Sequence, residues 1–348
     1  MKTASGTAAY TIQEVDLAAA SDALLSEVAD LRNVLSRELL PDDPPSPPEA
    51  FIARVRARPK MVRMKEWLAR DGEGSLAATA FVARYEADTN QHFREAGVSV
   101  VPRHRRRGIG RALYQRIVQG AGEGEDIVID GYTTDRVPAG EAFARSAGAK
   151  DVLRTHVNQL DLRELDRQLV REWTALAPAG YGLRWIDGDV PDELMANVLL
   201  AYDTMNTAPR GSSRADDWHT TTEQVAQWDR SRTGAGRERR LVLAIHAATG
   251  ETAGFTELEY SPKIPHVIGQ QGTAVIPAHR GRGLGKWIKG AMLDRAVRDW
   301  PAARYVRTGN ADSNAPMLAI NTRLGFTPIW ATTIWEVGIA DARRQAER

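Results

Sequence analysis

An internal repeat constrains the fold of this chain more than any other feature. Residues 98–113 and 273–288 share a proline, a histidine, an arginine and two glycines in the same order. Pro102 matches Pro277, an offset of 175 residues in a chain of 348, so the repeat spans half of the sequence. Two copies of one domain account for such a repeat, and the chain has the length of two domains of common size.

Fainter similarity continues on both sides of these segments. Residues 10–16 resemble 181–187, and residues 142–149 resemble 319–326. The offset changes along the chain, which indicates insertions in surface loops. The repeat predicts a division into an N-terminal domain at 1–165, a linker at 166–180 and a C-terminal domain at 181–348.

The hydrophobic pattern indicates strands and helices in the same order in each half. In the second half, residues 241–246 and 253–260 have the character of strands. From Leu284 to Ala296, apolar residues recur at the spacing of an amphipathic helix. Residues 231–240 carry glycine and arginine and are expected to form a surface loop. This order predicts mixed α/β (α+β) domains with a largely antiparallel sheet.

Charge and cysteine content exclude several classes of protein. The chain has 46 Lys and Arg against 45 Asp and Glu, a net charge of +1, so tight non-specific binding of nucleic acid is not expected. It has no cysteine, which excludes thiol catalysis, disulfides and zinc sites built on thiolates. No apolar run reaches the length of a membrane span, and the first 16 residues lack the apolar core of a signal peptide. We therefore expect a soluble cytoplasmic protein with no nucleic-acid or membrane partner.

A glycine-rich turn, residues 280–285, joins a strand to the start of a helix. The free N–H groups and the dipole of a helix N-terminus favour an anion, and glycine lets the backbone approach it closely. The turn lacks the Gly-Lys-Ser/Thr of a Walker loop, and Ile288 stands where a dinucleotide fingerprint needs its third glycine. The turn predicts a phosphate or diphosphate site in each half. A ligand-free turn, or nucleic-acid contact by the basic run 103–107, is the alternative.

The motif Arg-x-x-Gly-x-Gly after a Val-x-Pro strand resembles the acyl-CoA loop of the GNAT superfamily of N-acyltransferases. Residues 310–326 resemble the closing helix and strand of that family. The resemblance covers nearly the whole chain as two tandem GNAT-like domains, the type seen in mycothiol synthase. It implies acetyl-CoA as co-substrate, with its pyrophosphate on the loop, and no metal. The residues that it implies for acyl-CoA binding are Val275, Ile276, Arg280, Gly281, Arg282, Gly283, Leu284, Gly285, Lys286, Asn310, Asn314, Arg105, Arg107, Gly108, Ile109 and Gly110.

Amine acylation needs a base, because an unperturbed alkylamine with a pKa of about 10.4 is protonated at neutral pH. Glu257 and Glu259 share one strand face because their spacing is two, and Glu257 is our first candidate for the base. A solvated strand glutamate is the alternative. Gln271, on the next strand, could position a water molecule.

A general acid could protonate the departing thiolate of CoA. Many family members place a tyrosine four residues before the glycine of the Gly-Phe pair, and Asn321 stands there in this chain. We expect Asn321, the second candidate catalytic residue, to hold the CoA arm by its amide or to cap local backbone. Asn314 has the same two interpretations. His279 is expected to be a surface residue or a neighbour of the phosphate.

The first half lacks the Asn-rich closing segment and the Leu-Gly-Phe end. Its candidate carboxylates, Glu86 and Glu95, flank a turn. Because a function must be argued from a complete site, we expect catalysis in the second half, with the first half structural or a degenerate binding site.

Acceptor contacts are expected from residues 202–219, the connection after the early helices of the second half. Carboxylates there could receive a cationic amine, and aromatic residues could cover an apolar body; a solvated loop is the alternative. The candidates for acceptor binding are Asp203, Asn206, Trp218 and Gln271, with Asp216, Asp217 and Met205 nearby in sequence.

The resulting hypothesis is an N-acetyltransferase, a monomer or homodimer. It would transfer the acetyl group directly to the amine of a small molecule, such as an antibiotic or metabolite, in a ternary complex with general base catalysis. The alternatives are a non-catalytic acyl-CoA-binding or regulatory tandem module, and an acyltransferase that uses another acyl-CoA or acceptor.

Overall fold

The computed structural model describes residues 10–348. Residues 1–9, which belong to the segment in which we expect no signal peptide, lie outside the described residues. The chain forms two compact units. The first contains the described residues up to Leu153, with Ser212–Ala215 and Thr332–Arg348, and the second contains Arg154–Gly211 and Asp216–Ala331.

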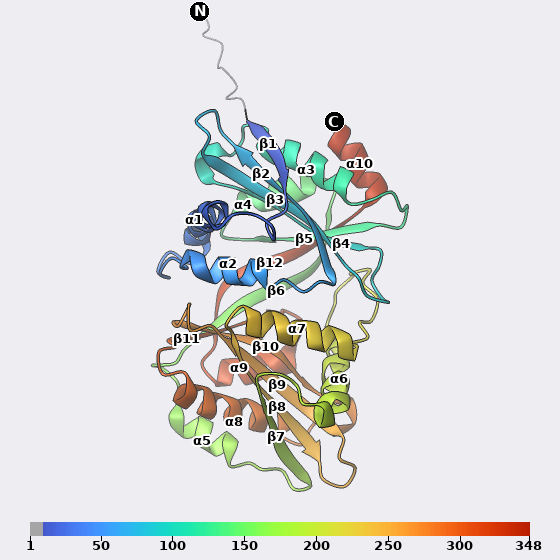
Figure 1. The fold of residues 1–348 in the computed structure, drawn as a ribbon. Coiled ribbons are helices and arrows are strands. Elements are labelled where there is room, and N and C mark those ends of the chain that lie inside the picture. Colours follow the sequence, from blue (N-terminus) through green and yellow to red (C-terminus); the bar gives the residue numbers. More distant parts are fainter. Residues whose placement is uncertain (1–9) are drawn as a thin grey trace, which may run out of the picture. The chain divides into compact units, whose positions relative to one another are not determined.

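The first unit is a sheet with helices on both faces (Figure 1). Trp67 and Leu68 are adjacent on one strand and are buried in different apolar clusters, because successive side chains of a strand point to opposite faces. The strand order is β1 (Thr11–Val15), β2 (Val62–Arg70), β3 (Leu76–Tyr85), β4 (Phe93–Val100), β5 (Val128–Thr134) and β12 (Thr327–Gly338). The helices are α1 (Asp22–Leu39), α2 (Pro48–Arg56), α3 (Ile109–Gly120), α4 (Pro138–Ser146) and α10 (Ile339–Glu347).

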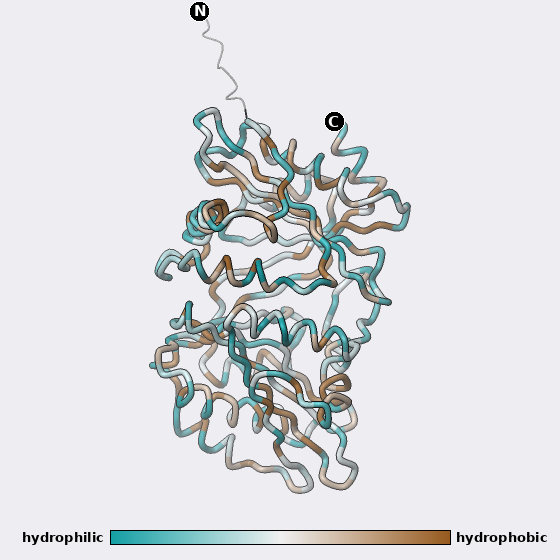
Figure 2. The backbone as a smooth tube through the Cα atoms, viewed as in Figure 1, coloured by the Kyte–Doolittle hydropathy of each residue, from teal (hydrophilic) through white to brown (hydrophobic). Residues whose placement is uncertain are grey.

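The second unit repeats this arrangement. Its strand order is β6 (Lys150–Asp161), β11 (Tyr305–Ala311), β10 (Val267–Val275), β9 (Thr252–Tyr260), β8 (Glu238–His246) and β7 (Tyr181–Asp187). Its helices are α5 (Arg167–Thr174), α6 (Met195–Asp203), α7 (Thr222–Gly234), α8 (Leu284–Asp299) and α9 (Ala315–Arg323), with a short 3₁₀ segment η3 (Thr204–Thr207). Figure 2 shows α6, sequence MANVLLAYD, as a largely hydrophobic segment, and its Val198 and Ala201 are fully buried.

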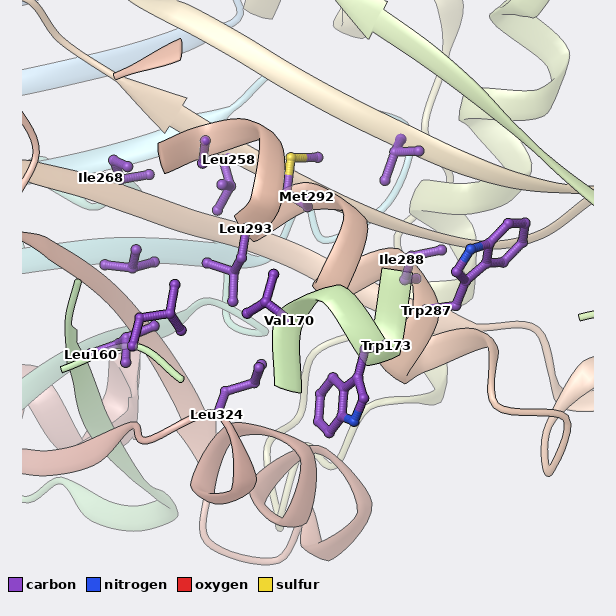
Figure 3. Close-up of a cluster of buried hydrophobic side chains, with 14 of the residues drawn as sticks. Leu160, Val170, Trp173, Leu258, Ile268, Trp287, Ile288, Met292, Leu293 and Leu324 are labelled. Atoms are coloured by element: carbon purple, nitrogen blue, oxygen red, sulfur yellow. The ribbon is translucent and has the colours of Figure 1, made fainter. Parts of the chain in front are cut away.

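The last strands of the two sequence halves are exchanged between the units. β6 ends the first half of the sequence, yet it pairs antiparallel with β11 of the second unit, Leu160 opposite Val306. β12 ends the second half and pairs antiparallel with β5 of the first unit, Trp335 opposite Gly131. Figure 3 shows Leu160 within the apolar core of the second unit. The sequence repeat does not indicate this exchange.

Residues 166–180, predicted to link the domains, contain the helix α5. It packs on α8, and Trp287 Nε1 of α8 donates a hydrogen bond to the carbonyl of Thr174, at 3.2 Å. Figure 3 shows α5 and α8 side by side, with Val170, Trp173 and Met292 among the buried side chains. The division at 1–165 and 181–348 thus follows the sequence repeat, whereas the compact units include the exchanged strands.

The predicted fold class is confirmed, because both units are mixed α/β with largely antiparallel sheets. In each unit one parallel pair interrupts the antiparallel order, β4 with β5 and β10 with β11. None of the helices in residues 10–348 combines the length and the apolar character needed to cross a bilayer.

Candidate active site

A pocket of about 470 Å³ opens in the second unit beside the strands β9 and β10. Its size is in the range of small-molecule sites. Aromatic and sulfur-containing side chains form much of its wall, and four charged side chains complete it. The lining residues are Tyr202, Met205, Asn206, Trp218, Thr220, Trp228, Ser231, Arg232, Arg237, Phe255, Glu257, Glu259, Gln271 and Gly272.

Glu257 lies at the wall of this pocket and is only 6% exposed. The hydroxyl of Tyr202 donates a hydrogen bond to Glu257 Oε2 at 3.1 Å. Glu257 Oε1 lies 3.7 Å from Arg239 Nη1 and 3.9 Å from Arg232 Nη2. Glu257 is therefore not a solvated strand glutamate, because its carboxyl group is enclosed by a phenol and two guanidinium groups.

The surroundings of Glu257 raise the affinity of its carboxylate for a proton, as a general base requires. Burial raises the pKa of the Glu257 carboxyl group above its usual value, and Arg239 and Arg232 offset part of this effect. Burial also raises the pKa of Tyr202, so its hydroxyl stays protonated and donates to the carboxylate at neutral pH. A carboxylate whose pKa is raised is better matched to accepting a proton near neutral pH.

An ion-pair network fixes the two arginines beside Glu257. Arg232 Nη1 lies 2.7 Å and Arg239 Nη1 3.1 Å from Asp229 Oδ1. Arg232 Nε donates to Glu259 Oε1 at 3.0 Å, and Arg237 also pairs with Glu259. Both Arg232 and Arg239 are buried, which a charged side chain tolerates only when it is paired.

This network corrects one expectation. Residues 231–240 do not form a surface loop, because they end α7 and begin β8, and they place Arg232 and Arg239 inside the unit. Their charges are balanced by carboxylates of α7 and β9. Tyr202 begins the segment 202–219 that we expected to contact the acceptor, but it was not among the candidate residues, and Trp228 lies outside that segment. No motif marks either of them as a pocket residue.

The predicted acceptor residues separate into two groups. Asn206, Trp218 and Gln271 line the pocket together with Glu257. Asn206 and Trp218 also hold each other, because the Asn206 amide donates to the Trp218 carbonyl at 2.8 Å and accepts from the Trp218 N–H at 2.9 Å. Asp203 does not line the pocket, and its Oδ1 accepts from the Thr220 N–H at 2.9 Å.

A β-bulge in β10 faces the same region. The register of β10 against β9 shifts between Gln270 and Thr273, so the intervening backbone is out of the regular ladder. The Gln270 amide holds the bulge by donating to the carbonyl of Glu257 at 2.7 Å. Gly272 is required there, because a Cβ atom on it would lie 2.8 Å from the ring of Phe255. β10 is paired with β11 only from Val267 to Gly269, before the bulge.

The glycine turn of the second unit leads directly into α8. Gly281 and Gly283 have φ angles of 77° and 80°, a left-handed conformation that favours glycine. No side chain caps α8, so the N–H groups of its first turn are available to an anion. Arg280 anchors the turn, since its Nε donates to the Val275 carbonyl at 3.0 Å and its Nη2 to Thr207 Oγ1 at 2.9 Å. Leu284 is buried in the core, so only its backbone is available to a ligand.

The first unit has the same turn. Gly108 has a φ of 86° and starts α3 without a side-chain cap. Arg106, at the position of Gly281, is also left-handed, with a φ of 61°. Arg105 Nε donates to the Val100 carbonyl at 3.0 Å, as Arg280 does to Val275, and Arg105 also pairs with Glu38. The remaining predicted residues of this turn are the exposed Arg107, the buried Ile109, and Gly110 beside the ring of Phe143.

The repeat extends to a tyrosine–histidine contact beside each turn. The hydroxyl of Tyr181 lies 2.9 Å from His279 Nδ1 in the second unit, and that of Tyr10 lies 3.3 Å from His104 Nδ1 in the first. His279 is thus a neighbour of the turn, held by the first strand of its sheet.

The closing segment holds a buried polar chain. Asn321 is 2% exposed, donates to Asn310 Oδ1 at 2.8 Å and accepts from Lys289 Nζ at 2.7 Å. Burial lowers the pKa of the Lys289 amine to about 7. Asn314 Oδ1 accepts from the Met317 N–H at 3.4 Å and so caps α9. Sequence analysis did not single out Lys289, which lies within the apolar stripe of α8.

Three other predicted residues lie around the turn and its strand. Val275 packs against the apolar core, Ile276 follows it and donates its N–H to the Ala253 carbonyl, and Lys286 lies over the ring of Trp173 at 5.9 Å. Arg282 is exposed.

The first unit lacks the counterpart of the pocket's carboxylate. Glu86 is paired with Arg63 at the surface of this unit, and Glu95 accepts a hydrogen bond from the Tyr85 hydroxyl at 3.1 Å. Asp130 lies between Glu95 and Glu336 in the register of three strands. Burial, followed by the two neighbouring carboxylates, raises the pKa of Asp130 to about 7. β4 keeps an unbroken register against β3 and shows no bulge. In residues 10–348, no group of three or more His, Asp or Glu side chains is placed to hold a metal ion.

Two mixed α/β units, each with a glycine turn between a strand and a helix, define a tandem acetyltransferase fold. The chain belongs to the acetyltransferase (GNAT) family, whose model matches residues 28–148 and 202–326. A tandem GNAT protein from the clavulanic acid biosynthesis pathway is similar in structure, with a TM-score of 0.77 and 26% identity over 95% of this chain and 99% of that one. A GCN5-related N-acetyltransferase from Sphaerobacter thermophilus has a TM-score of 0.66 and 16% identity, over 95% and 96% of the two chains. A search among curated proteins found no match.

Proposed function

We propose that the second unit is an N-acetyltransferase that moves the acetyl group of acetyl-CoA directly to the amine of a small molecule in a ternary complex. One observation carries the proposal: Glu257, a buried carboxylate with a raised pKa, lies at the wall of a small-molecule pocket next to the bulged strand β10. Membership of the acetyltransferase family supports the reaction class.

Acetyl-CoA is the donor substrate, and the glycine turn fits its pyrophosphate. A Cβ atom on Gly281 or Gly283 would meet nothing within 4 Å, so these glycines serve the left-handed backbone and leave space in front of the turn. The uncapped N-terminus of α8 supplies N–H groups, and the exposed Arg282 supplies charge. The remaining predicted donor-site residues shape the strand and helix on either side of this turn.

The chemistry assigns one role to each group. Glu257 accepts a proton from the acceptor ammonium and returns it to solvent. The neutral amine then attacks the thioester carbonyl, the N–C bond forms and the C–S bond breaks. The second nitrogen proton passes to the departing thiolate. Backbone N–H groups at the bulge, Gln271 and Gly272, are our candidates for the oxyanion donor.

In this proposal Asn321 supports the donor side and does not protonate the leaving group. Its amide is already engaged by Lys289 and Asn310. A thiol with a pKa near 8.5 leaves without a strong acid, so the reaction does not require one here. We propose that Asn321 and Asn310 hold α9 beside the CoA arm.

The first unit, by this proposal, does not catalyse the reaction and is structural or a degenerate binding site. The relative from the clavulanic acid pathway supports secondary metabolism as the setting of this tandem protein. A non-catalytic acyl-CoA-binding module and the use of another acyl-CoA or acceptor are the competing hypotheses.

Thiol release tests the proposal directly, and the absence of cysteine means that the protein contributes no thiol background. Purified protein with acetyl-CoA and a panel of amines is expected to release CoA. Glu257→Gln is expected to lower kcat/KM by about 10² to 10⁴. Glu251→Gln, an exposed glutamate just before β9, is the matched control and keeps wild-type activity. Full activity of Glu257→Gln at every pH would refute the assignment of the base, and a panel that releases no CoA would favour the binding module.

A further inference from the structure

We infer that the acceptor is a primary amine that also carries a carboxylate, with an apolar body between the two groups and the carboxylate bound by Arg237. This inference rests on the proposed function of the second unit and names the substrate class of its pocket.

The charges of the pocket wall are the first reason. The charged lining residues are two carboxylates, Glu257 and Glu259, and two guanidinium groups, Arg232 and Arg237. Both carboxylates are already engaged by arginines. The wall therefore offers no uncommitted carboxylate to a dicationic or polycationic acceptor. Asp203 and Asp217, which we expected could receive a cationic amine, do not line the pocket, and Asp217 pairs with Arg210 at 2.7 Å.

Arg237 differs from the arginines deeper in the network. Arg232 is shared among Asp229, Glu257 and Glu259 and is buried. Arg237 pairs with Glu259, which Arg232 already neutralises, and 37% of its side chain is exposed. A guanidinium group at a pocket wall, partly exposed and sharing its counter-ion, is able to take a second carboxylate in a bidentate pair.

The proton transfer to Glu257 also favours an acceptor that carries a carboxylate. The network consists of three carboxylates, Asp229, Glu257 and Glu259, and three guanidinium groups, Arg232, Arg237 and Arg239. Once Glu257 has taken the proton of the amine, the network carries one excess positive charge. An unbalanced charge in a poorly solvated site is costly, and a carboxylate on the acceptor restores the balance.

The remaining wall fits the body of the acceptor. Tyr202, Trp218, Trp228 and Phe255 present aromatic surface, and Tyr202 meets Trp228 and Phe255 in edge-to-face contacts with centroids 6.0 and 5.7 Å apart. Glu257 and Glu259 lie two residues apart on β9, roughly 7 Å along the strand. Because Arg237 pairs with Glu259, the amine at Glu257 and the carboxylate at Arg237 are bound at separate points of one apolar wall.

Binding of acetylated products tests this without any turnover. N-acetylated amino acids with aromatic or aliphatic bodies, and with the carboxylate α, β or γ to the nitrogen, are compared with their primary carboxamides. The amides keep the body and remove the negative charge. Calorimetric titration into the full-length protein loaded with CoA is expected to show at least one carboxylate that binds ten to a hundred times more tightly than its amide. A panel in which no carboxylate exceeds its amide, including one in which nothing binds, overturns the inference.

Variants test whether Arg237 causes the preference for the carboxylate over the amide. Arg237→Gln is expected to remove the difference between carboxylate and amide, and Arg237→Lys is expected to retain part of it. Arg230→Gln, an exposed arginine of α7 that pairs with Glu223, is the matched control and keeps the full preference. A preference that survives Arg237→Gln overturns the assignment. Acetyl transfer to amines without any carboxylate preference refutes the inference alone, whereas carboxylate-selective binding without transfer refutes the proposed function alone.

Discussion

Glu257 of β9 and Phe81 of β3 occupy the same position in the strand registers of their two units. Val275 pairs with Gly254, and its counterpart Val100 pairs with Ala78, and Glu257 and Phe81 each follow three residues later. Phe81 fills the space beside its neighbouring strand, because a Cβ atom on Gly97 would lie 2.6 Å from its ring. Both units of the duplicated fold have the glycine turn, whereas only the second unit has a carboxylate at the position of the proposed base.

Burial raises the pKa of Glu257, and Tyr202 opposes part of this effect by donating a hydrogen bond to its carboxylate. Tyr202→Phe removes that hydrogen bond, which favours the ionised form, so the pKa of Glu257 rises further. We expect the acidic limb of the kcat/KM profile to move about one unit toward higher pH, the size of a hydrogen bond to a charged group. Tyr260→Phe, which alters a tyrosine stacked on Trp300, is the control and leaves the profile in place. If the acidic limb of the kcat/KM profile does not move in Tyr202→Phe, the ionisation of Glu257 does not produce that limb.

Gly283 is required by the left-handed backbone at the start of α8. Gly283→Val forces an unfavourable conformation on the turn, and we expect the affinity for acetyl-CoA to fall at least tenfold, measured by calorimetry. Gly250→Val is the matched control, because Gly250 is also left-handed, with a φ of 72° and open space around it, but lies in the turn before β9. If the two variants bind acetyl-CoA as the wild type does, the second turn is not the main donor site, and Gly108→Val then tests the first.

Lys289 is expected to make stability rise with pH. Its folded pKa is about 7 and its unfolded value is near 10.4, so between these values the unfolded chain binds more protons and the folded state gains stability as pH increases. In Lys289→Met this contribution is absent. Thermal unfolding at pH 6 and pH 9 is expected to show a smaller pH-dependent rise of Tm in the variant. An identical rise in both proteins would place the charge of Lys289 in contact with water.

Asp130 is expected to have the opposite effect. Its folded pKa is about 7 against an ordinary value of 3.8, so between these values the folded state binds more protons and stability falls as pH increases. Asp130→Asn removes the cost of ionising a partly buried carboxyl group beside Glu95 and Glu336. The variant is expected to have a higher Tm than the wild type at pH 8 and a similar Tm at pH 4. Asp135→Asn, in the turn after β5, serves as the control. A Tm that is unchanged at pH 8 in Asp130→Asn would contradict the prediction.

Local sequence patterns predicted much of the second unit. The period of two along β9 placed Glu257 and Glu259 on one face, and the structure shows both at the pocket wall. The apolar spacing after Gly283 predicted α8, which runs from Leu284 to Asp299. The glycines predicted a tight turn before a helix, and Gly281 and Gly283 have the left-handed backbone of such a turn. These features follow from the conformational preferences of a few consecutive residues, so a single sequence contains the information.

The sequence by itself thus determined the duplication, the mixed α/β class, the glycine turn before a helix in each half, and the face of the candidate base. Only the tertiary structure decided that the last strands are exchanged, that Arg232 and Arg239 are buried, and that Asn321 is bound by Lys289. Strand pairing and the burial of a charge depend on partners far away in sequence. Arg232 lies in a stretch rich in glycine and arginine that has the pattern of a loop, until folding brings Glu257 of β9 within ion-pair distance of its guanidinium group.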